Sequence, residues 1–156
     1  MPRADAFADA LAVLDAHYQA MPPVAAMGLA IGGFDGTRLR LHAPLARHVN
    51  DKGCAFGGSL ASLMTLAGWG LVALRLHEDG IEAEVFVADS EVRYLKPLFA
   101  DLAAEAELAA DVDWNDVLAD LRGRGRARIG LVARVRLPDG GVAAEARAGF
   151  VAIAKG

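Results

Sequence analysis

The sequence has little cysteine and few aromatic residues, and it carries no strong excess of either charge. Cys54 is the only cysteine in 156 residues, which excludes an internal disulfide framework and fits a reducing cytoplasm. The net charge of −4 gives no reason to expect nucleic acid or an anionic membrane as a partner. Four histidines and one cysteine lie far apart in the chain, so neither a metal ion nor another cofactor is expected.

Signal-peptide features are also missing from the N-terminus, where Asp5 and Asp9 interrupt any apolar stretch. The composition, 54% hydrophobic and 23% charged, is typical of a globular protein with one buried core. Because only 6% of the residues are aromatic, we expect this core to consist of small aliphatic side chains. We expect a single domain over residues 24–156, preceded by an N-terminal helix and linker over residues 1–23.

One long run in the chain carries no charge, namely the twenty-two residues from Gly53 to Leu74. Its length and apolarity would suit a transmembrane helix. Five glycines, two serines and a threonine weaken that interpretation, and a charged, strand-patterned half of the chain follows. A helix that is apolar on every side belongs inside lipid or protein. We expect this one inside protein, wrapped by a sheet, with no membrane as partner.

Helical and strand periodicities divide the remainder of the chain. Apolar residues at helical spacing predict a helix over residues 4–20, which Pro22 and Pro23 end. Alternating residues predict strands at 28–34 and 37–43 around a turn. Four further strands and a short helix are expected later in the chain, at 84–95, 102–109, 126–137, 142–154 and 113–121 respectively.

The order helix, two strands, long helix and four strands predicts an α+β protein. We expect one long antiparallel sheet that curves around the uncharged helix. In the strand at 84–95, strict alternation puts Phe86, Val92 and Tyr94 on the face opposite Asp89. The uncharged helix also needs cover where the sheet leaves it open. A second copy of the chain would supply that cover, so we expect a homodimer, with a tetramer as the alternative.

Three stretches carry a resemblance to a known family: NDKGCAFGGSLASLMTLAGWGLV from Asn50, VADSEVRYLKP ending at Pro97, and GRARI from Gly125. Together they resemble the hotdog-fold acyl-thioesterase superfamily, most closely the thioesterases named after the YiiD C-terminal domain. The resemblance runs from about Ala25 to Ala154 and leaves the N-terminal helix outside. It implies a hotdog fold and an acyl group in thioester linkage to coenzyme A or acyl carrier protein as substrate. The reaction stays open, because a fold does not determine a chemistry.

Gly57 and Gly58 open the uncharged helix and are candidates for an oxyanion hole. N–H groups at a helix N-terminus lack partners within the helix and carry the positive end of its dipole. Such donors stabilise a developing oxyanion by about 3–4 kcal/mol. A tight turn with close helix–sheet packing explains the same glycines. The resemblance implies that Asn50 positions the substrate or an attacking water. Asparagine is also common in turns for backbone reasons alone.

Two positions depart from the pattern of many hotdog thioesterases. In those enzymes a histidine precedes the glycine pair, and this chain has Phe56 there. Their helix carries an aspartate or glutamate at the position that Thr65 occupies in this chain. Thr65 lies eight residues beyond Gly57, about 12 Å along a helix, so one carbonyl group hardly reaches both. The resemblance implies a site shared between subunits, with Gly57 from one and Thr65 from the other. The alternative for Thr65 is a hydroxyl group bonded to its own helix.

The missing carboxylate bears on the reaction, for which we favour hydrolysis. Hydrolysis needs a base to activate water, and Asp51, Asp89 or Glu91 would serve, although each also suits a solvated or structural role. Decarboxylation of a malonyl thioester needs an oxyanion hole but no such base. A non-catalytic module that binds acyl thioesters would have the same pocket.

Four arginines alternate from Arg122 to Arg128, and in an extended chain they would form a basic strip on one side. Such a strip suits the phosphates of coenzyme A or an acidic carrier protein, and equally a solvated sheet face or ion pairs. His42 and His48 are expected to be exposed, and Cys54 to be a structural thiol. The candidate catalytic residues are Asn50, Gly57, Gly58 and Thr65, and the candidate substrate-binding residues are Phe56, Ser59, Ser90, Arg124, Arg126 and Arg128.

Overall fold

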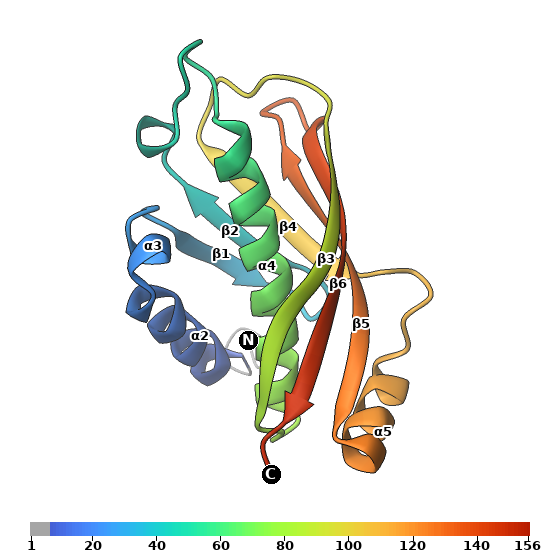
Figure 1. The fold of residues 1–156 in the computed structure, drawn as a ribbon. Helices are drawn as coiled ribbons and strands as arrows, with labels where there is room; N and C mark the ends of the chain where they lie inside the picture. Colours follow the sequence, from blue (N-terminus) through green and yellow to red (C-terminus); the bar gives the residue numbers. More distant parts are fainter. Residues whose placement is uncertain (1–6) are drawn as a thin grey trace.

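A six-stranded antiparallel sheet curves around one long helix in the computed structural model, which describes residues 7–156 (Figure 1). The strands lie in the order β1-β2-β4-β5-β6-β3, so β1 and β3 form the two edges. This arrangement confirms the predicted α+β architecture. The strands are β1 (Ala30–Phe34), β2 (Leu39–Ala43), β3 (Ala83–Tyr94), β4 (Leu102–Leu108), β5 (Arg126–Arg136) and β6 (Val142–Ala154). The helices are α2 (Ala8–Ala20), α3 (Pro22–Ala25), α4 (Gly57–Glu78) and α5 (Trp114–Arg124), with a 3-10 helix η1 (Leu45–Arg47).

The central helix α4 contains the uncharged run from Gly57 onward, continues to Glu78, and lies inside the curve of the sheet (Figure 1). Length and composition alone would allow it to cross a membrane, but the sheet and α2 enclose it. Gly68 shows how closely helix and sheet approach, because a Cβ atom there would lie 2.9 Å from the Phe150 ring. The helix thus packs on protein through the sheet and α2, as predicted, and leaves Gly58 and Ser62 exposed on one side. Its buried residues are Leu60, Leu63, Met64, Ala67, Gly68, Gly70, Leu71, Val72, Leu74 and Leu76.

The N-terminal helix α2 shares a core with α4. The Tyr18 side chain is fully buried, and its hydroxyl group donates a hydrogen bond of 2.6 Å to the Leu66 carbonyl oxygen. Burial raises the pKa of this phenol well above its usual range, so it remains a donor. The predicted division of the chain after residue 23 falls inside the short helix α3, and α2 on the near side of it packs into the same core as the rest of the chain. Residues 4–6 of the predicted helix lie outside the described part of the chain.

The edge strand β3 contains a bulge that shifts its alternation. Its pairing with β6 slips by one residue between Val87 and Asp89. Before the bulge Val85 packs against the core, and after it Val92 does, so the inward residues change from odd to even numbers. Phe86 therefore lies on the outer face with Asp89, and its expected place beside Val92 is wrong.

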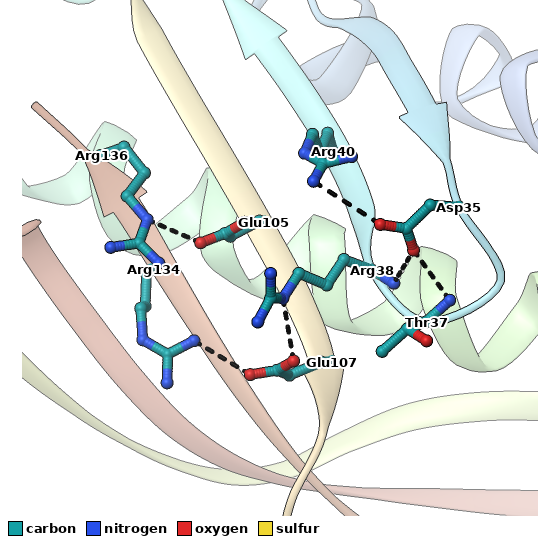
Figure 2. Close-up of polar contacts among 8 residues, drawn as sticks. All are labelled: Asp35, Thr37, Arg38, Arg40, Glu105, Glu107, Arg134 and Arg136. Atoms are coloured by element: carbon teal, nitrogen blue, oxygen red, sulfur yellow. Dashed lines mark hydrogen bonds and ion pairs between the residues drawn. The ribbon is translucent and has the colours of Figure 1, made fainter. Parts of the chain in front are cut away.

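The outer face of the sheet carries a set of ion pairs (Figure 2). Glu107 accepts hydrogen bonds from Arg38 at 3.0 Å and from Arg134 at 3.1 Å, and Arg136 donates to Glu105 at 2.7 Å. Burial alone would raise the pKa of Glu107, but the hydrogen bonds from both arginines outweigh it and hold this pKa below its ordinary value. These arginines are therefore engaged with carboxylates of the same chain.

Candidate active site

The loop before α4 closes on itself. Val49 and Ala55 form an isolated β-bridge, and the Phe56 N–H donates to the His48 carbonyl oxygen at 2.7 Å. Gly53, at φ +82°, turns the chain in a conformation that favours glycine. His48 and Phe56 therefore lie side by side where α4 begins.

Asn50 organises this loop. Its side-chain oxygen accepts hydrogen bonds from the N–H groups of Lys52 at 2.8 Å and Cys54 at 3.2 Å, as in an Asx turn. Its NH₂ group lies 3.3 Å from the Cys54 sulfur, which is buried as a structural thiol would be. The structure thus shows the backbone role considered for Asn50, and its contact with substrate stays a prediction.

Two free N–H groups begin α4. Within residues 7–156, the N–H groups of Gly57 and Gly58 have no backbone acceptor, whereas that of Ser59 donates to the Phe56 carbonyl oxygen. Helix geometry leaves these first N–H groups unpaired and places the positive end of the dipole beside them. Gly58 is exposed, and the Phe56 ring lies so close that a Cβ atom on Gly58 would approach it to 2.5 Å. Such a helix start is suited to an oxyanion.

A cleft of about 580 Å³ opens beside this helix start, between α4 and the segment that leads from α3 to β1. In Figure 1, α2 and α3 lie on one side of α4 and β3 lies on the other, so the cleft is on the α3 side. The cleft brings together four candidate residues from the sequence: Phe56, Gly58, Ser59 and Thr65. The other residues that line it are Pro23, Val24, Met27, His48, Ala61, Ser62 and Leu66.

Gly57 borders a second hollow, of about 280 Å³, on the β3 side of the helix. There the Tyr94 hydroxyl group donates to the Gly57 carbonyl oxygen at 3.0 Å and ties the end of β3 to the first turn of α4. Ser90, further back on β3, is exposed and is not part of the lining of either hollow. A role for Ser90 in substrate binding stays a prediction.

His48 is buried, and the expectation that it is exposed is wrong. Only 7% of its surface is accessible. Its Nε2 lies 2.8 Å from the Met27 carbonyl oxygen, and its Nδ1 lies 2.8 Å from the Ser59 Oγ. A carbonyl oxygen can only accept, so in the neutral ring Nε2 carries the proton and Nδ1 accepts the hydrogen bond of the Ser59 hydroxyl group. The turn residues between Asn50 and Gly53 are the sequence signal that could have placed His48 beside the helix.

The predicted basic strip does not form. Arg122 and Arg124 belong to the last turn of α5, where Arg124 pairs with Asp120 at 3.4 Å. Gly125, at φ +74°, then ends the helix and β5 begins. The expected extended alternation over residues 122–128 is therefore wrong, because its first half is helical.

The three carboxylates considered as bases lie outside the cleft. Asp89 pairs with Arg128 at 2.6 Å on the outer face of the sheet, where Arg126 is exposed at the start of β5. Glu91 lies on the same face, and Asp51 is exposed in the loop before α4. No carboxylate occurs among the described residues that line the cleft. Within residues 7–156 there is also no cluster of three potential metal ligands.

The curved sheet, the enclosed helix and the cleft at its N-terminus define the class: a hotdog-fold protein of the thioesterase superfamily. The chain belongs to the family described as "Putative thioesterase (yiiD_Cterm)", whose model matches residues 11–154. The predicted family and hotdog fold are confirmed. The match begins inside α2, so the expected limit of the resemblance near Ala25 is corrected to include most of the N-terminal helix.

Solved structures of other proteins share this fold. A protein of unknown function from Chlorobaculum tepidum has 25% sequence identity and a TM-score of 0.84, over 96% of this chain and 94% of that one. A "putative thioesterase" from Shewanella oneidensis has 27% identity and a TM-score of 0.83, over 93% of this chain and 98% of that one. A "probable thioesterase" from Pseudomonas aeruginosa has 23% identity and a TM-score of 0.75, over 94% of each chain.

Proposed function

We propose that this protein hydrolyses acyl thioesters, with the carbonyl oxygen of the thioester at the free N–H groups of Gly57 and Gly58. Family membership supports the class of enzyme. The observation that supports this reaction centre is the start of α4, where the exposed Gly58 lines the cleft and the unpaired N–H of Gly57 is its direct neighbour. Donors of this kind contribute about 3–4 kcal/mol to stabilisation of the tetrahedral intermediate. Their interaction strengthens as negative charge develops on the oxygen, which is what lowers a barrier.

The cleft supports an acyl group as the part of the substrate that is held. Its volume of about 580 Å³ is within the range of small-molecule sites, about 300–1,000 Å³. The lining is apolar at Val24, Met27 and Leu66 and carries hydroxyl groups at Ser62 and Thr65. In this proposal the acyl chain lies in the cleft, and the carrier, coenzyme A or acyl carrier protein, remains outside it.

A homodimer is part of the proposal, with a tetramer as the larger assembly. The edge strand β3 leaves one side of its backbone without a neighbouring strand, and sheet edges of this kind pair readily with another chain. Exposed apolar side chains surround the edge, as at a protein interface. Two copies would share the site, as the resemblance implies: Thr65 of the second subunit would face Gly57 on the β3 side, whereas Thr65 of the same subunit lines the cleft beside Gly58. The exposed apolar residues on β3 and directly after it are Phe86, Val87, Tyr94 and Leu95.

A second candidate reaction is decarboxylation of a malonyl thioester. The absence of carboxylates among the described residues of the cleft lining favours it, because a carboxylate there would repel the malonyl group. The enolate that remains after carbon dioxide leaves needs the same oxyanion donors. The product would be an acetyl thioester instead of a free thiol and an acid.

Product analysis separates these reactions. The purified protein is incubated with malonyl, acetyl and longer acyl thioesters of coenzyme A and of acyl carrier protein, and the products are identified by mass spectrometry. Free thiol with the matching acid supports hydrolysis. Formation of acetyl thioester from the malonyl substrate would overturn hydrolysis and support decarboxylation. Saturable binding without turnover would overturn both reactions and support a binding module. The Arg40→Ala variant on the outer face is the control and is expected to retain full activity.

A further inference from the structure

The contact between His48 and Ser59 has the geometry of an activated nucleophile. Ser59 lies in the first turn of α4, directly after Gly58, and both residues line the cleft. Its Oγ is 2.8 Å from His48 Nδ1, within the reach needed for proton transfer from a nucleophile to a base. Of the described residues that line the cleft, His48 alone has a side chain that commonly accepts a proton near neutral pH.

The imidazole of His48 is oriented by a third group, as in catalytic dyads and triads. The Met27 carbonyl oxygen is 2.8 Å from Nε2 and selects the tautomer in which Nδ1 is free to accept a proton. Once Nδ1 takes up a proton, the same carbonyl group accepts a charge-assisted hydrogen bond from the imidazolium. Because only 7% of the His48 surface is exposed, water competes little for either nitrogen. The Met27 carbonyl group thus holds the ring with Nδ1 directed at Ser59.

We propose that Ser59 is a covalent nucleophile and that His48 is its base; this inference rests on the proposed hydrolysis of acyl thioesters. Ser59 Oγ attacks the thioester carbonyl carbon while its proton passes to His48 Nδ1. The carbon–sulfur bond then breaks, and the leaving thiolate takes that proton and departs as the thiol. Water attacks the resulting acyl-serine ester and gives a proton to His48. The carboxylic acid leaves, and Ser59 Oγ recovers the proton from His48.

This assignment accounts for catalysis without a carboxylate in the cleft. In many hotdog thioesterases, which this chain resembles, an aspartate or glutamate on the helix occupies the position of Thr65. In this proposal His48, which lies in the loop before the helix, supplies the base instead. Ser62 is a matched comparison, because it is an exposed serine one turn further along the same helix and lines the same cleft. Its hydroxyl group is not hydrogen-bonded to the imidazole, whose two nitrogens are engaged by Ser59 and Met27.

Covalent trapping tests the proposal. Wild-type protein, Ser59→Ala, Ser62→Ala and His48→Gln are treated with an alkyl fluorophosphonate, and separately with acyl-coenzyme A followed by an acid quench. Intact-protein and peptide mass spectrometry are expected to show one adduct, on Ser59, in the wild type and in Ser62→Ala. Ser59→Ala is expected to form no adduct, and its kcat is expected to be at least 100-fold lower than that of the wild type. His48→Gln is expected to slow phosphonate labelling at least tenfold.

The readouts distinguish this inference from the function on which it rests. Thiol release by the wild type, with no adduct and with full turnover by Ser59→Ala, overturns the nucleophile and leaves hydrolysis intact. Phosphonate labelling of Ser59 without thiol release from any donor supports the activated serine and overturns the proposed hydrolysis. Absence of both overturns both. Circular dichroism and thermal unfolding verify the fold of each variant, and Ser59→Ala carries the test if His48→Gln does not fold.

Discussion

The hydroxyl group of Tyr18 lies directly over Gly70 of α4, in space that any side chain at position 70 would occupy. From there it donates to the Leu66 carbonyl oxygen at 2.6 Å. The glycine lets α2 approach α4 closely enough to complete the core. The N-terminal helix is thereby held against the same central helix that carries the candidate active site.

Substitution of Gly70 by alanine is expected to destabilise the fold by about 1–3 kcal/mol, because the new Cβ atom displaces the Tyr18 ring. Gly123→Ala in α5 is the matched control, since it also replaces a helical glycine but has open space around the new atom. That control is expected to gain up to about 1 kcal/mol from helix propensity. Urea unfolding measures both changes. Equal stability of Gly70→Ala and the wild type would contradict the packing of α2 on α4.

Replacement of Gly58 by proline removes one proposed oxyanion donor while leaving the helix able to form. Proline is tolerated in a first helical turn, and α3 of this chain itself begins with Pro22 and Pro23. Gly58→Ala is the matched control, because it adds a Cβ atom against the Phe56 ring but keeps the N–H group. We expect kcat of Gly58→Pro to fall at least 100-fold below that of Gly58→Ala. Equal kcat values would place the oxyanion elsewhere.

The carboxyl group of Glu107 makes stability depend on pH. Its hydrogen bonds from Arg38 and Arg134 outweigh burial and hold its folded-state pKa below its unfolded-state value. A depressed pKa adds stability above the unfolded-state pKa and loses it as the pH falls through the folded-state pKa. The free energy of unfolding of the wild type is therefore expected to exceed that of Glu107→Gln by about 1 kcal/mol at pH 7. This difference is expected to shrink below about pH 4. Urea unfolding across this range checks it, and a constant difference would refute the electrostatic origin.

Assembly through the β3 edge is tested by a charge placed on that strand. Val87 is 47% exposed on β3, and lysine on an edge strand opposes pairing with another chain. The wild type is expected to sediment as the proposed dimer and Val87→Lys as a monomer in sedimentation equilibrium. Ile153→Lys is the control, because Ile153 is 44% exposed on β6, which has a strand on each side. A monomeric wild type, or dissociation by both variants alike, would refute assembly through this edge.

The elements of the fold were predictable because their signals are local. The uncharged run became α4, and Gly36 and Gly140, at φ +96° and +90°, lie in the turns that the sequence marked between strand pairs. The last turn of α5 was misplaced because Arg122 to Arg128 alternate in sequence while the first half is helical. Hydrophobic patterning contains little information on where such a helix ends, and Gly125 was the residue that marked it.

The site was less predictable because it depends on contacts between distant segments. Gly58 and Thr65 were found through the resemblance, and the structure places both in one cleft. His48 was missed, since its partners Ser59 and Met27 are 11 and 21 residues away in sequence. No periodicity records such a contact. The bulge in β3 was missed for a similar reason, because it appears only when the strand is aligned with β6.

The hydrogen bond from Tyr94 to the Gly57 carbonyl oxygen has a consequence for the N–H of Gly58, because both groups belong to one planar peptide unit. The phenol draws electron density toward the oxygen and makes the N–H at the far end a stronger, better-aimed donor. Tyr94 is the last residue of the free edge strand, so a second copy that adds to that edge would stiffen the phenol and, through one amide, the reaction centre. If the proposed dimer forms through this edge, specific activity would rise with protein concentration. Dilution would dissociate the dimer and lower the activity.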